Sequence, residues 1–443
     1  MADLPLETQE AIRKAASVLT EEPDDYIPLQ RMLRNKSFVL LGEATHGTHD
    51  FYQARVTITK QLITEHGLSA IAIEGDWPSA FRVNRYVRWQ GGDQSADEAL
   101  SDFRRFPMWM WRNTVVQEFV DWLREHNRGL PPNRQVGFYG LDMYSLYESA
   151  AAVVEYLEQV DPGAARLARQ RYGCLEHASD ERHYGYGVTL GRQGSCEDEV
   201  VKQLQDLRNK AFSYIQGQGM TAEDELFQAE QNARLVQSAE AYYRQMFSSR
   251  INTWNLRDSH MSETLDNLHL HLSRQQGHSA RIAVWAHNSH LGDARATDMG
   301  RRGEHNVGQL ARQRYANDCV LVGLTTYRGT VSASSDWDGP VERKRVRPAV
   351  PGSIEDILHR THLERFILPL QGALAEPLRE SRLQRAIGVL YLPESERASH
   401  YFRCLLADQF DVVLHFDETR ALEPLDSTSE WVLGEEETYP FGL

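Results

Sequence analysis

Six short, mostly apolar runs have the pattern of strands that are buried on both faces of a sheet. They are Ser37–Gly42, Ala70–Gly75, Val136–Leu141, Arg281–Ala286, Cys319–Thr325 and Ala386–Leu392. A seventh run, Val412–Phe416, is expected at the edge of the sheet. Between the early runs, Phe51–His66 and Val115–Asn127 place apolar residues at helical spacing. This alternation predicts an α/β fold with a mainly parallel, or mixed, central sheet flanked by helices.

Polar and ionisable residues follow four of these runs at the point where each run ends. They are Glu43 and His46 after the first run, Glu74 and Asp76 at the second, Asp142 at the third, and His287, Asn288 and His290 at the fourth. The carboxyl ends of parallel strands meet at one edge of a sheet, so these side chains are expected to line one cleft. Each carboxylate taken alone is more often a helix cap, but several such groups at successive strand ends favour a functional site.

His46 is the best candidate for a general base, because imidazole can take a proton from water and return it to a leaving group near neutral pH. Glu43, three residues earlier, can orient one ring nitrogen of His46. Arg55 lies further along the expected helix and can reach a carboxylate or a developing oxyanion. His49 is better explained as a helix cap or a surface residue.

The pattern changes over residues 145–272, where long amphipathic stretches follow one another without a strand. They are Leu146–Gln159, Glu197–Gln216, Ala222–Met246 and Trp254–Leu272. His183–Ser195 is rich in glycine and tyrosine and is expected to be an ordered loop. We therefore predict a catalytic α/β core of residues 1–144 and 273–443, with residues 145–272 as a helical insertion that covers the cleft. Arg257 and Asp258 of this insertion either face the cleft or form a local ion pair.

A second group of residues is assigned to substrate binding: Asp142, Arg257, Trp109 and Trp111. The two tryptophans belong to an aromatic segment, Phe103–Asn113, that can form an apolar wall for a bulky substrate. Packing in the hydrophobic core is the competing interpretation of this segment.

Charge and cysteine content narrow the class of protein. The formal net charge is −15, which argues against binding to nucleic acid or to anionic lipid. No apolar run approaches 18 residues, so no membrane span is expected, and the N-terminal residues do not have the pattern expected of a secretory signal. The four cysteines form no Cys-x-x-Cys pair and are expected to be reduced, mostly buried thiols. These features predict a cytoplasmic protein.

Several common catalytic motifs are absent from the sequence. There is no Gly-x-Ser-x-Gly elbow, no phosphate-binding or dinucleotide-binding glycine loop, and no His-Glu-x-x-His. A hydrolase with this sequence is therefore expected to activate water directly. His and carboxylate groups can do so without a cofactor, or through zinc or manganese held by Glu43, His46, Glu74, His287 and His290.

The chain resembles the erythromycin esterase family in a series of motifs that occur in order over its first two-thirds. They are LGEATHGTHDFYQAR (41–55), AIEGDWPSAFRVNRYV (72–87), FPMWMWRN (106–113), FYGLDMYSL (138–146), NLRDSHM (255–261) and VWAHNSHLGD (284–293). The resemblance implies a water-activating histidine at His46 and supporting roles for Glu43, Arg55, Glu74, His287 and His290. It also implies the opening of a macrolide lactone, although residues beyond about 310 match no motif that would fix the substrate.

The leading hypothesis is a metal-independent hydrolase of a carboxylic ester or macrolide lactone, acting as a monomer or homodimer on a small molecule. One alternative is a metal-dependent ester or peptide hydrolase on a similar scaffold, resembling the Tiki-type proteases. The other is a protein resembling the ChaN haem-binding lipoproteins, in which the same strand-end groups hold a ligand without turnover. The absence of a lipoprotein signal and the full set of ionisable groups favour catalysis.

Overall fold

The computed structural model describes residues 6–20, 22–175, 180–192, 194–215, 219–247, 250–372 and 375–434. Within them, nine strands form one sheet with the order β1-β8-β11-β6-β2-β5-β3-β4, and β7 pairs with β6. The strands of this sheet are β1 (Ser17–Val18), β2 (Phe38–Leu41), β3 (Ala70–Asp76), β4 (Gly137–Asp142), β5 (Ile282–Trp285), β6 (Cys319–Ala333), β7 (Glu342–Val346), β8 (Arg365–Pro369) and β11 (Val412–Thr419). A separate ladder joins β9 (Arg382–Arg385) to β10 (Tyr401–Cys404).

The central strands run parallel, from β11 through β6, β2, β5 and β3 to β4. The pairs β1–β8, β8–β11 and β6–β7 are antiparallel. The predicted α/β class with a mainly parallel, mixed sheet is therefore confirmed. Strand residues alternate between two hydrophobic clusters, since Phe38 and Leu40 face one cluster while Val39 and Leu41 face the other.

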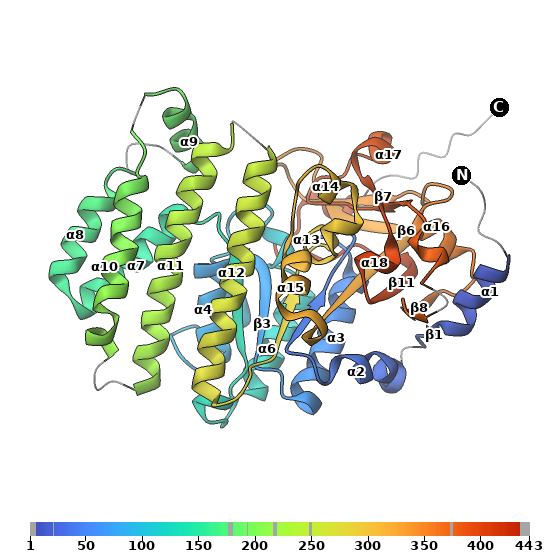
Figure 1. Ribbon diagram of the computed structural model, residues 1–443, viewed down its shortest axis with the longest axis horizontal. Coiled ribbons are helices and arrows are strands. Elements are labelled where there is room, and N and C mark those ends of the chain that lie inside the picture. The colour runs from blue at the N-terminus through green and yellow to red at the C-terminus, as the bar shows by residue number, and fades with distance from the viewer. Residues whose placement is uncertain are drawn as a thin grey trace.

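Helices cover both faces of the sheet (Figure 1). The core helices are α1 (Leu6–Ala15), α2 (Ile27–Leu33), α3 (His49–His66), α4 (Trp77–Val87), α5 (Ala96–Leu100), α6 (Thr114–His126), α13 (Asn288–Leu291), α14 (Asp298–Arg301), α15 (Val307–Tyr315), α16 (Ile354–His359), α17 (Glu396–Ser399), α18 (Leu406–Gln409) and α19 (Ser429–Leu433). Local sequence sets their ends. Asn113 caps α6 by accepting a hydrogen bond from the Val116 amide, and α3 ends at Gly67 in the left-handed conformation.

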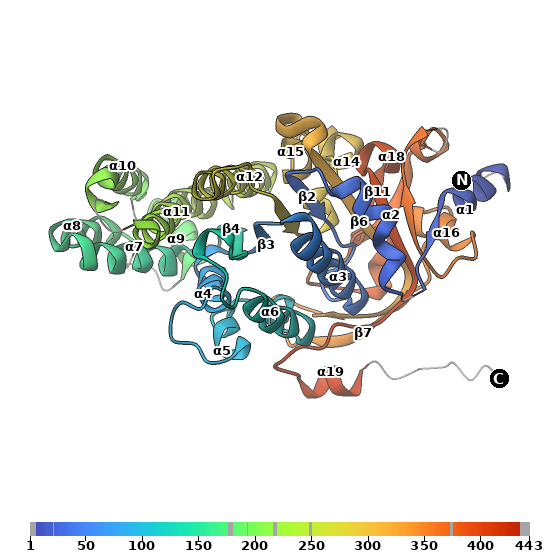
Figure 2. The ribbon, with the colours of Figure 1, turned by 90° about the horizontal axis from the view of Figure 1, so that it is seen from below.

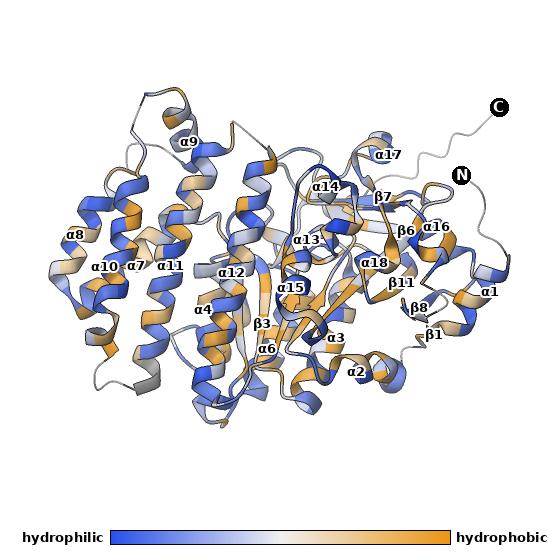
Figure 3. Ribbon diagram, viewed as in Figure 1, coloured by the Kyte–Doolittle hydropathy of each residue, from blue (hydrophilic) through white to orange (hydrophobic). Residues whose placement is uncertain are grey.

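The helical region lies beside the β4 end of the sheet (Figures 1 and 2). Its helices are α7 (Leu146–Val160), α8 (Pro162–Tyr172), α9 (Glu181–Thr189), α10 (Glu197–Ile215), α11 (Gly219–Gln245) and α12 (Arg250–Gln276). Of these, α12 packs against β4 and α11, while α8 and α10 lie further from the sheet. The four predicted amphipathic stretches are helical, except that α11 ends at Gln245, so Met246 lies in the turn after it; residue 216 lies outside the described residues. Figure 3 shows apolar strands at the centre and alternating polar and apolar segments along these helices.

Two strand predictions were wrong in part. Ala386–Leu392 forms no strand: Ile387 and Leu390 make single bridges to Thr45 and Ser334. The apolar side chains of this run are buried in a small cluster instead, in which Ile387 and Tyr391 pack against residues of β6 and β7. Val412–Phe416 is a strand but not an edge strand, because β8 pairs with its outer side.

The predicted loop at His183–Ser195 and the predicted thiols also need correction. Residues 181–189 form α9, capped by Asp180. Gly185 lies in this helix at its contact with α11. A Cβ there would come within 2.1 Å of the Tyr243 carbonyl oxygen, so glycine is needed for α9 to pack this closely on α11. Cys174 and Cys196 form a disulfide that joins the segments before and after α9. The expectation of reduced thiols therefore holds only for Cys319 and Cys404, which are free and buried.

Candidate functional site

The strand order places the four predicted polar strand ends next to one another. β2, β5, β3 and β4 are consecutive neighbours and run parallel, so their carboxyl ends share one edge of the sheet. Glu43 and His46 follow β2, Glu74 lies on β3, Asp142 ends β4, and His287 and His290 follow β5. All six residues are buried, and His46 retains 6% of its surface exposed. The structure thus brings together every strand-end residue that the sequence nominated for catalysis.

Glu43 lies between His46 and Arg55 and binds both. Its Oε1 is 3.0 Å from His46 Nδ1, and its Oε2 accepts a hydrogen bond of 2.6 Å from Arg55 Nη2. The guanidinium of Arg55 is fully buried and lies over the Tyr52 and Trp285 rings, 4.3 and 5.3 Å from their centroids. A carboxylate neutralised by Arg55 can only accept, so His46 Nδ1 carries its proton toward Glu43. In the neutral ring the lone pair is therefore on Nε2.

Close packing fixes the turn that carries Glu43. A Cβ on Gly42 would come within 2.1 Å of Asn288 Oδ1, which means that only glycine fits here without displacing Asn288. The Asn288 amide donates to the Glu43 carbonyl oxygen at 2.8 Å, and its side chain donates to the Leu324 carbonyl oxygen. Asn288 therefore ties the ends of β2, β5 and β6 together.

Glu74 is the most shared carboxylate of the group. Its Oε1 lies 2.8 Å from Arg257 Nη2, 3.3 Å from His290 Nε2 and 3.9 Å from His46 Nε2. Its Oε2 accepts from the backbone amide of His287 at 2.8 Å. Burial would raise the pKa of Glu74, but the charge of His290, together with that of Arg257, outweighs it and holds the pKa well below the usual value. Glu74 is therefore an anion at neutral pH.

Arg257 reaches the site from α12 and joins two strand ends. It binds Asp142 through two nitrogens, with Nε 3.0 Å from Oδ1 and Nη2 2.6 Å from Oδ2, in addition to its contact with Glu74. Its guanidinium also lies 5.0 Å from the centroid of the Tyr144 ring. Of the two interpretations of Arg257, the one that faces the strand ends is therefore correct, and a local pair with Asp258 is not formed.

His290 is held as a cation. Its Nδ1 lies 2.9 and 3.0 Å from the two oxygens of Asp258, and Nε2 faces Glu74. Burial would lower the pKa of His290, but the carboxylates of Asp258 and Glu74 raise it to about 9, with Arg257 opposing them. At neutral pH the ring is therefore favoured as a cation that donates from Nδ1 to Asp258, while its Nε2 lies 3.3 Å from Glu74 Oε1 and 3.1 Å from Arg257 Nη1.

His287 is held neutral, with a defined tautomer. Burial lowers the pKa of His287 to about 3. Its Nδ1 accepts a hydrogen bond from the backbone amide of Ser289 at 3.2 Å and lies 2.8 Å from Ser289 Oγ. An amide nitrogen can only donate, so the ring proton is on Nε2. This Nε2 is buried without a hydrogen-bond partner, and the His287 ring centroid lies 4.9 Å from that of His46.

The other predicted residues lie around this group rather than in it. Trp111 donates from Nε1 to the Glu74 carbonyl oxygen at 3.0 Å, whereas Trp109 and Trp111 are both buried in the second hydrophobic cluster. Asp76 turns toward Arg105 and the Tyr144 amide. His49 contacts Arg420, away from the strand ends.

Sequence reasoning gave no specific role to three residues that contact the histidines: Asp258, Trp254 and Ser289. Trp254 lies flat on His290, with ring centroids 4.6 Å apart and planes inclined by 7°. Asp258, Arg257 and Trp254 share one face of α12, because they are three and four residues apart. That spacing was a usable signal once the helix was predicted.

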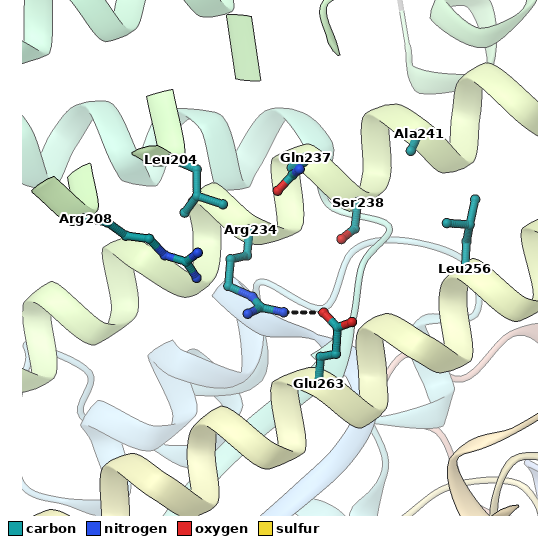
Figure 4. Close-up of a pocket in the computed structure, with 8 residues that line it drawn as sticks. All are labelled: Leu204, Arg208, Arg234, Gln237, Ser238, Ala241, Leu256 and Glu263. Atoms are coloured by element: carbon teal, nitrogen blue, oxygen red, sulfur yellow. Dashed lines mark hydrogen bonds and ion pairs between the residues drawn. The ribbon is translucent and has the colours of Figure 1, made fainter. Parts of the chain in front are cut away.

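A cavity of about 350 Å³ lies away from this group, between α10, α11 and α12. Figure 4 shows Arg208, Arg234, Gln237 and Ser238 around it, with the Arg234–Glu263 ion pair. None of the predicted site residues lines it.

The donor chemistry of the site bears on metal binding. No group of three or more His, Cys, Asp or Glu side chains is arranged to hold a metal ion among the residues that the structure describes. The carboxylates here are already bound by Arg55, Arg257 or His290.

None of the helices in the described part of the chain is long and apolar enough to cross a membrane.

Solved structures share this fold. A succinoglycan biosynthesis protein superposes with a TM-score of 0.76 at 20% identity, covering 94% of this chain and 98% of that one. A Bacillus cereus protein superposes with a TM-score of 0.76 at 21% identity, covering 94% of this chain and 98% of that one. An erythromycin esterase mutant in its open conformation superposes with a TM-score of 0.67 at 17% identity, covering 90% of this chain and 94% of that one. At these identities the likeness shows the fold alone.

Sequence relatives cover most of the chain. YbfO of Bacillus subtilis (strain 168), which carries a hydrolase name, is 22% identical over 352 residues, 74% of this chain and 73% of its own. Erythromycin esterase type II of Escherichia coli is 20% identical over 325 residues, 70% of this chain and 74% of its own. The erythromycin esterase family model matches residues 63–419, a range that begins after Glu43, His46 and Arg55. The chain belongs to the erythromycin esterase family.

Proposed function

We propose that this protein hydrolyses a carboxylic ester, with a macrolide lactone as the first substrate to test, using water activated by His46. The observation that carries the proposal is the Glu43–His46 pair. Glu43 fixes the Nδ1 proton at 3.0 Å, and Arg55 fixes Glu43, which leaves the lone pair of Nε2 for a water molecule. Family membership and the hydrolase names of its relatives support hydrolysis.

In the proposed first step, His46 Nε2 takes one proton from water while the water oxygen bonds to the acyl carbon of the ester. The carbonyl π bond becomes an oxyanion. In the second step the oxyanion collapses, the bond from the acyl carbon to the ester oxygen breaks, and His46 returns its proton to the leaving oxygen. The products are a carboxylic acid and an alcohol, which remain in one molecule when the substrate is a lactone.

His287 is the proposed donor to the oxyanion. It is neutral and its proton is on Nε2, which makes no hydrogen bond of normal geometry, although the ring also interacts with the Ala44 backbone. A fixed donor beside the base that makes no such bond in the protein can bind negative charge as it develops. The His46 and His287 ring centroids lie 4.9 Å apart, so the proposed donor lies next to the proposed base.

Glu74, Arg257 and His290 are proposed to set the charge around the base. Glu74 Oε1 lies 3.9 Å from His46 Nε2, near enough to accept from a water molecule that His46 also binds. Two cations, Arg257 and His290, keep Glu74 ionised. Glu74 then stabilises His46 when it becomes an imidazolium after the first step.

Metal-independent hydrolysis is part of the proposal. Each carboxylate near His46 is engaged by a cationic side chain, so the site supplies its positive charge from Arg55, Arg257 and His290. The metal-dependent and haem-binding alternatives have no comparable observation in their favour, and they are distinguished by experiment below.

The test is a panel of macrolides, simpler lactones and acyclic esters, each incubated with the purified protein and followed by mass spectrometry. Ring opening adds the mass of one water molecule to a lactone. We expect that product from at least one lactone with the protein, and not with a His46→Asn variant of the same purity. A panel with no hydrolysed member, or equal product from the variant, overturns the proposal.

A further inference from the structure

One helix of the insertion encloses His290 from three sides. Trp254, Arg257 and Asp258 of α12 are spaced so that they occupy one helix face. Trp254 covers the ring plane, Asp258 binds Nδ1, and Arg257 Nη1 lies 3.1 Å from Nε2. The position of His290 therefore depends on α12 as well as on its own short helix.

The Trp254 ring is itself held in place. Its Nε1 donates to the His305 carbonyl oxygen at 2.8 Å, and its plane is within 7° of the His290 plane at a centroid distance of 4.6 Å. Asp258 is fixed in the same way, because its Oδ1 also accepts from the Val307 amide at 3.0 Å. Both contacts join α12 to residues that follow β5.

We propose that Trp254 is a positioning residue of this site, which holds the His290 ring in the plane where Nδ1 meets Asp258 and Nε2 meets Glu74. The proposal rests on the proposed function, in which Glu74 and His290 set the charge around His46. An aromatic face also attracts a cation, so the stack favours the protonated ring. With Trp254 removed, the ring is free to rotate away from Glu74.

The ionisable groups that face His290 come from three parts of the chain. Asp258 and Arg257 lie on α12, Glu74 on β3, and His287 immediately before α13. Asp258 and Glu74 favour the cation, and Arg257 opposes it. The contribution of Trp254 is expected to be smaller than that of Asp258, because it acts through its ring face and through the geometry of the other two contacts.

The experiment compares Trp254→Leu, which removes the ring, with Trp254→Phe, which keeps an aromatic face. The pKa of His290 is read by NMR of histidine-labelled full-length protein, with a His290→Asn variant to assign the signal. In Trp254→Leu we expect this pKa to fall by about one unit and kcat to fall about threefold with little change in KM. In Trp254→Phe the pKa of His290 and kcat should both be close to those of the wild type. Leu270→Ala, at an exposed position of α12, is the matched control and should change neither.

Two results would overturn the proposal: an unchanged His290 pKa in a folded Trp254→Leu protein, or a loss of kcat without any shift of that pKa. If Trp254→Leu does not fold, Trp254→Met takes its place with the same expected values. The NMR measurement needs no turnover. A protein that hydrolyses no ester but shows the expected pKa shift would therefore contradict the proposed function and leave the role of Trp254 supported.

Discussion

Two histidine–carboxylate pairs lie in this site, and they differ at the second ring nitrogen. His46 donates from Nδ1 to Glu43, and its Nε2 has a carboxylate no nearer than 3.9 Å. His290 donates from Nδ1 to Asp258, but its Nε2 lies 3.3 Å from Glu74 and its ring is covered by Trp254. The first pair has a nitrogen free to take a proton, whereas the second is a closed cation.

This difference shows that a histidine beside a carboxylate is not by itself a general base. The carboxylate fixes the tautomer in both pairs, and the surroundings of the other nitrogen decide the chemistry. A base needs that nitrogen open, whereas a permanent cation needs it bound to a second anion. The predictions below change one pair at a time.

The largest effect is expected from His46→Asn, which removes the open nitrogen. We expect kcat for a hydrolysed ester to fall about 10³-fold, within the range for loss of a general base, with KM nearly unchanged. The matched control is His49→Asn, at a nearby histidine that contacts Arg420 instead of the site. Steady-state kinetics of both variants measure kcat and KM. Equal kcat values for wild type and His46→Asn would show that His46 is not the general base.

The pair formed by Glu43 and His46 was accessible to sequence reasoning because both residues follow one apolar run within four positions. A strand end and a spacing of three were enough to nominate them. The strands were predicted for the same reason, since buried parallel strands are continuous apolar runs. β8 was missed because RFILP is short and bounded by arginine and proline, and β11 was consequently expected at the edge.

The pair formed by Asp258 and His290 was not accessible in the same way. The two residues are 32 positions apart and lie on different elements. The amphipathic pattern located α12, but it did not show which face turns toward the strand ends. Its polar face carries both Asp258 and residues such as Asp266, which binds Arg314 and Tyr315 of α15, and only the packing of α12 in the fold distinguishes them.

Glu43→Gln is the next largest change, and it affects activity and stability together. We expect kcat to fall about 10²-fold, because the amide no longer fixes the Nδ1 proton of His46. The free energy of unfolding should fall by about 3 kcal/mol, because Arg55 keeps a buried charge without its partner. Urea unfolding measures the second value.

The double variant Glu43→Gln with Arg55→Met separates these two effects. Removing the unpaired charge should restore most of the stability, while activity stays low. Recovery of activity in the double variant would show that Glu43 serves only to neutralise Arg55.

Asp258→Asn changes the closed pair and should have a smaller effect, about a tenfold loss of kcat. The pKa of His290 is raised from 6.5 to about 9, so its contribution to stability is fully present below pH 6.5 and is lost as the pH rises through about 9. Wild type should therefore lose stability over this range, and Asp258→Asn should lose less. Urea unfolding at a series of pH values tests this, with Leu270→Ala at an exposed position of the same helix as control. Parallel pH profiles for wild type and Asp258→Asn would contradict the cationic assignment.

The smallest effect is expected from removing divalent metals, because the cations of both pairs are side chains. Protein dialysed against a chelator should keep its full rate, with Arg55, Arg257 and His290 still balancing the carboxylates. A loss of activity that Zn²⁺ or Mn²⁺ restores would mean that the reaction needs a metal ion, which would bind Glu74 in place of Arg257. A Soret band on haem titration, without turnover of any ester, would instead assign these histidines to ligand binding. Only an unchanged rate leaves the open nitrogen of His46 as the source of the activated water.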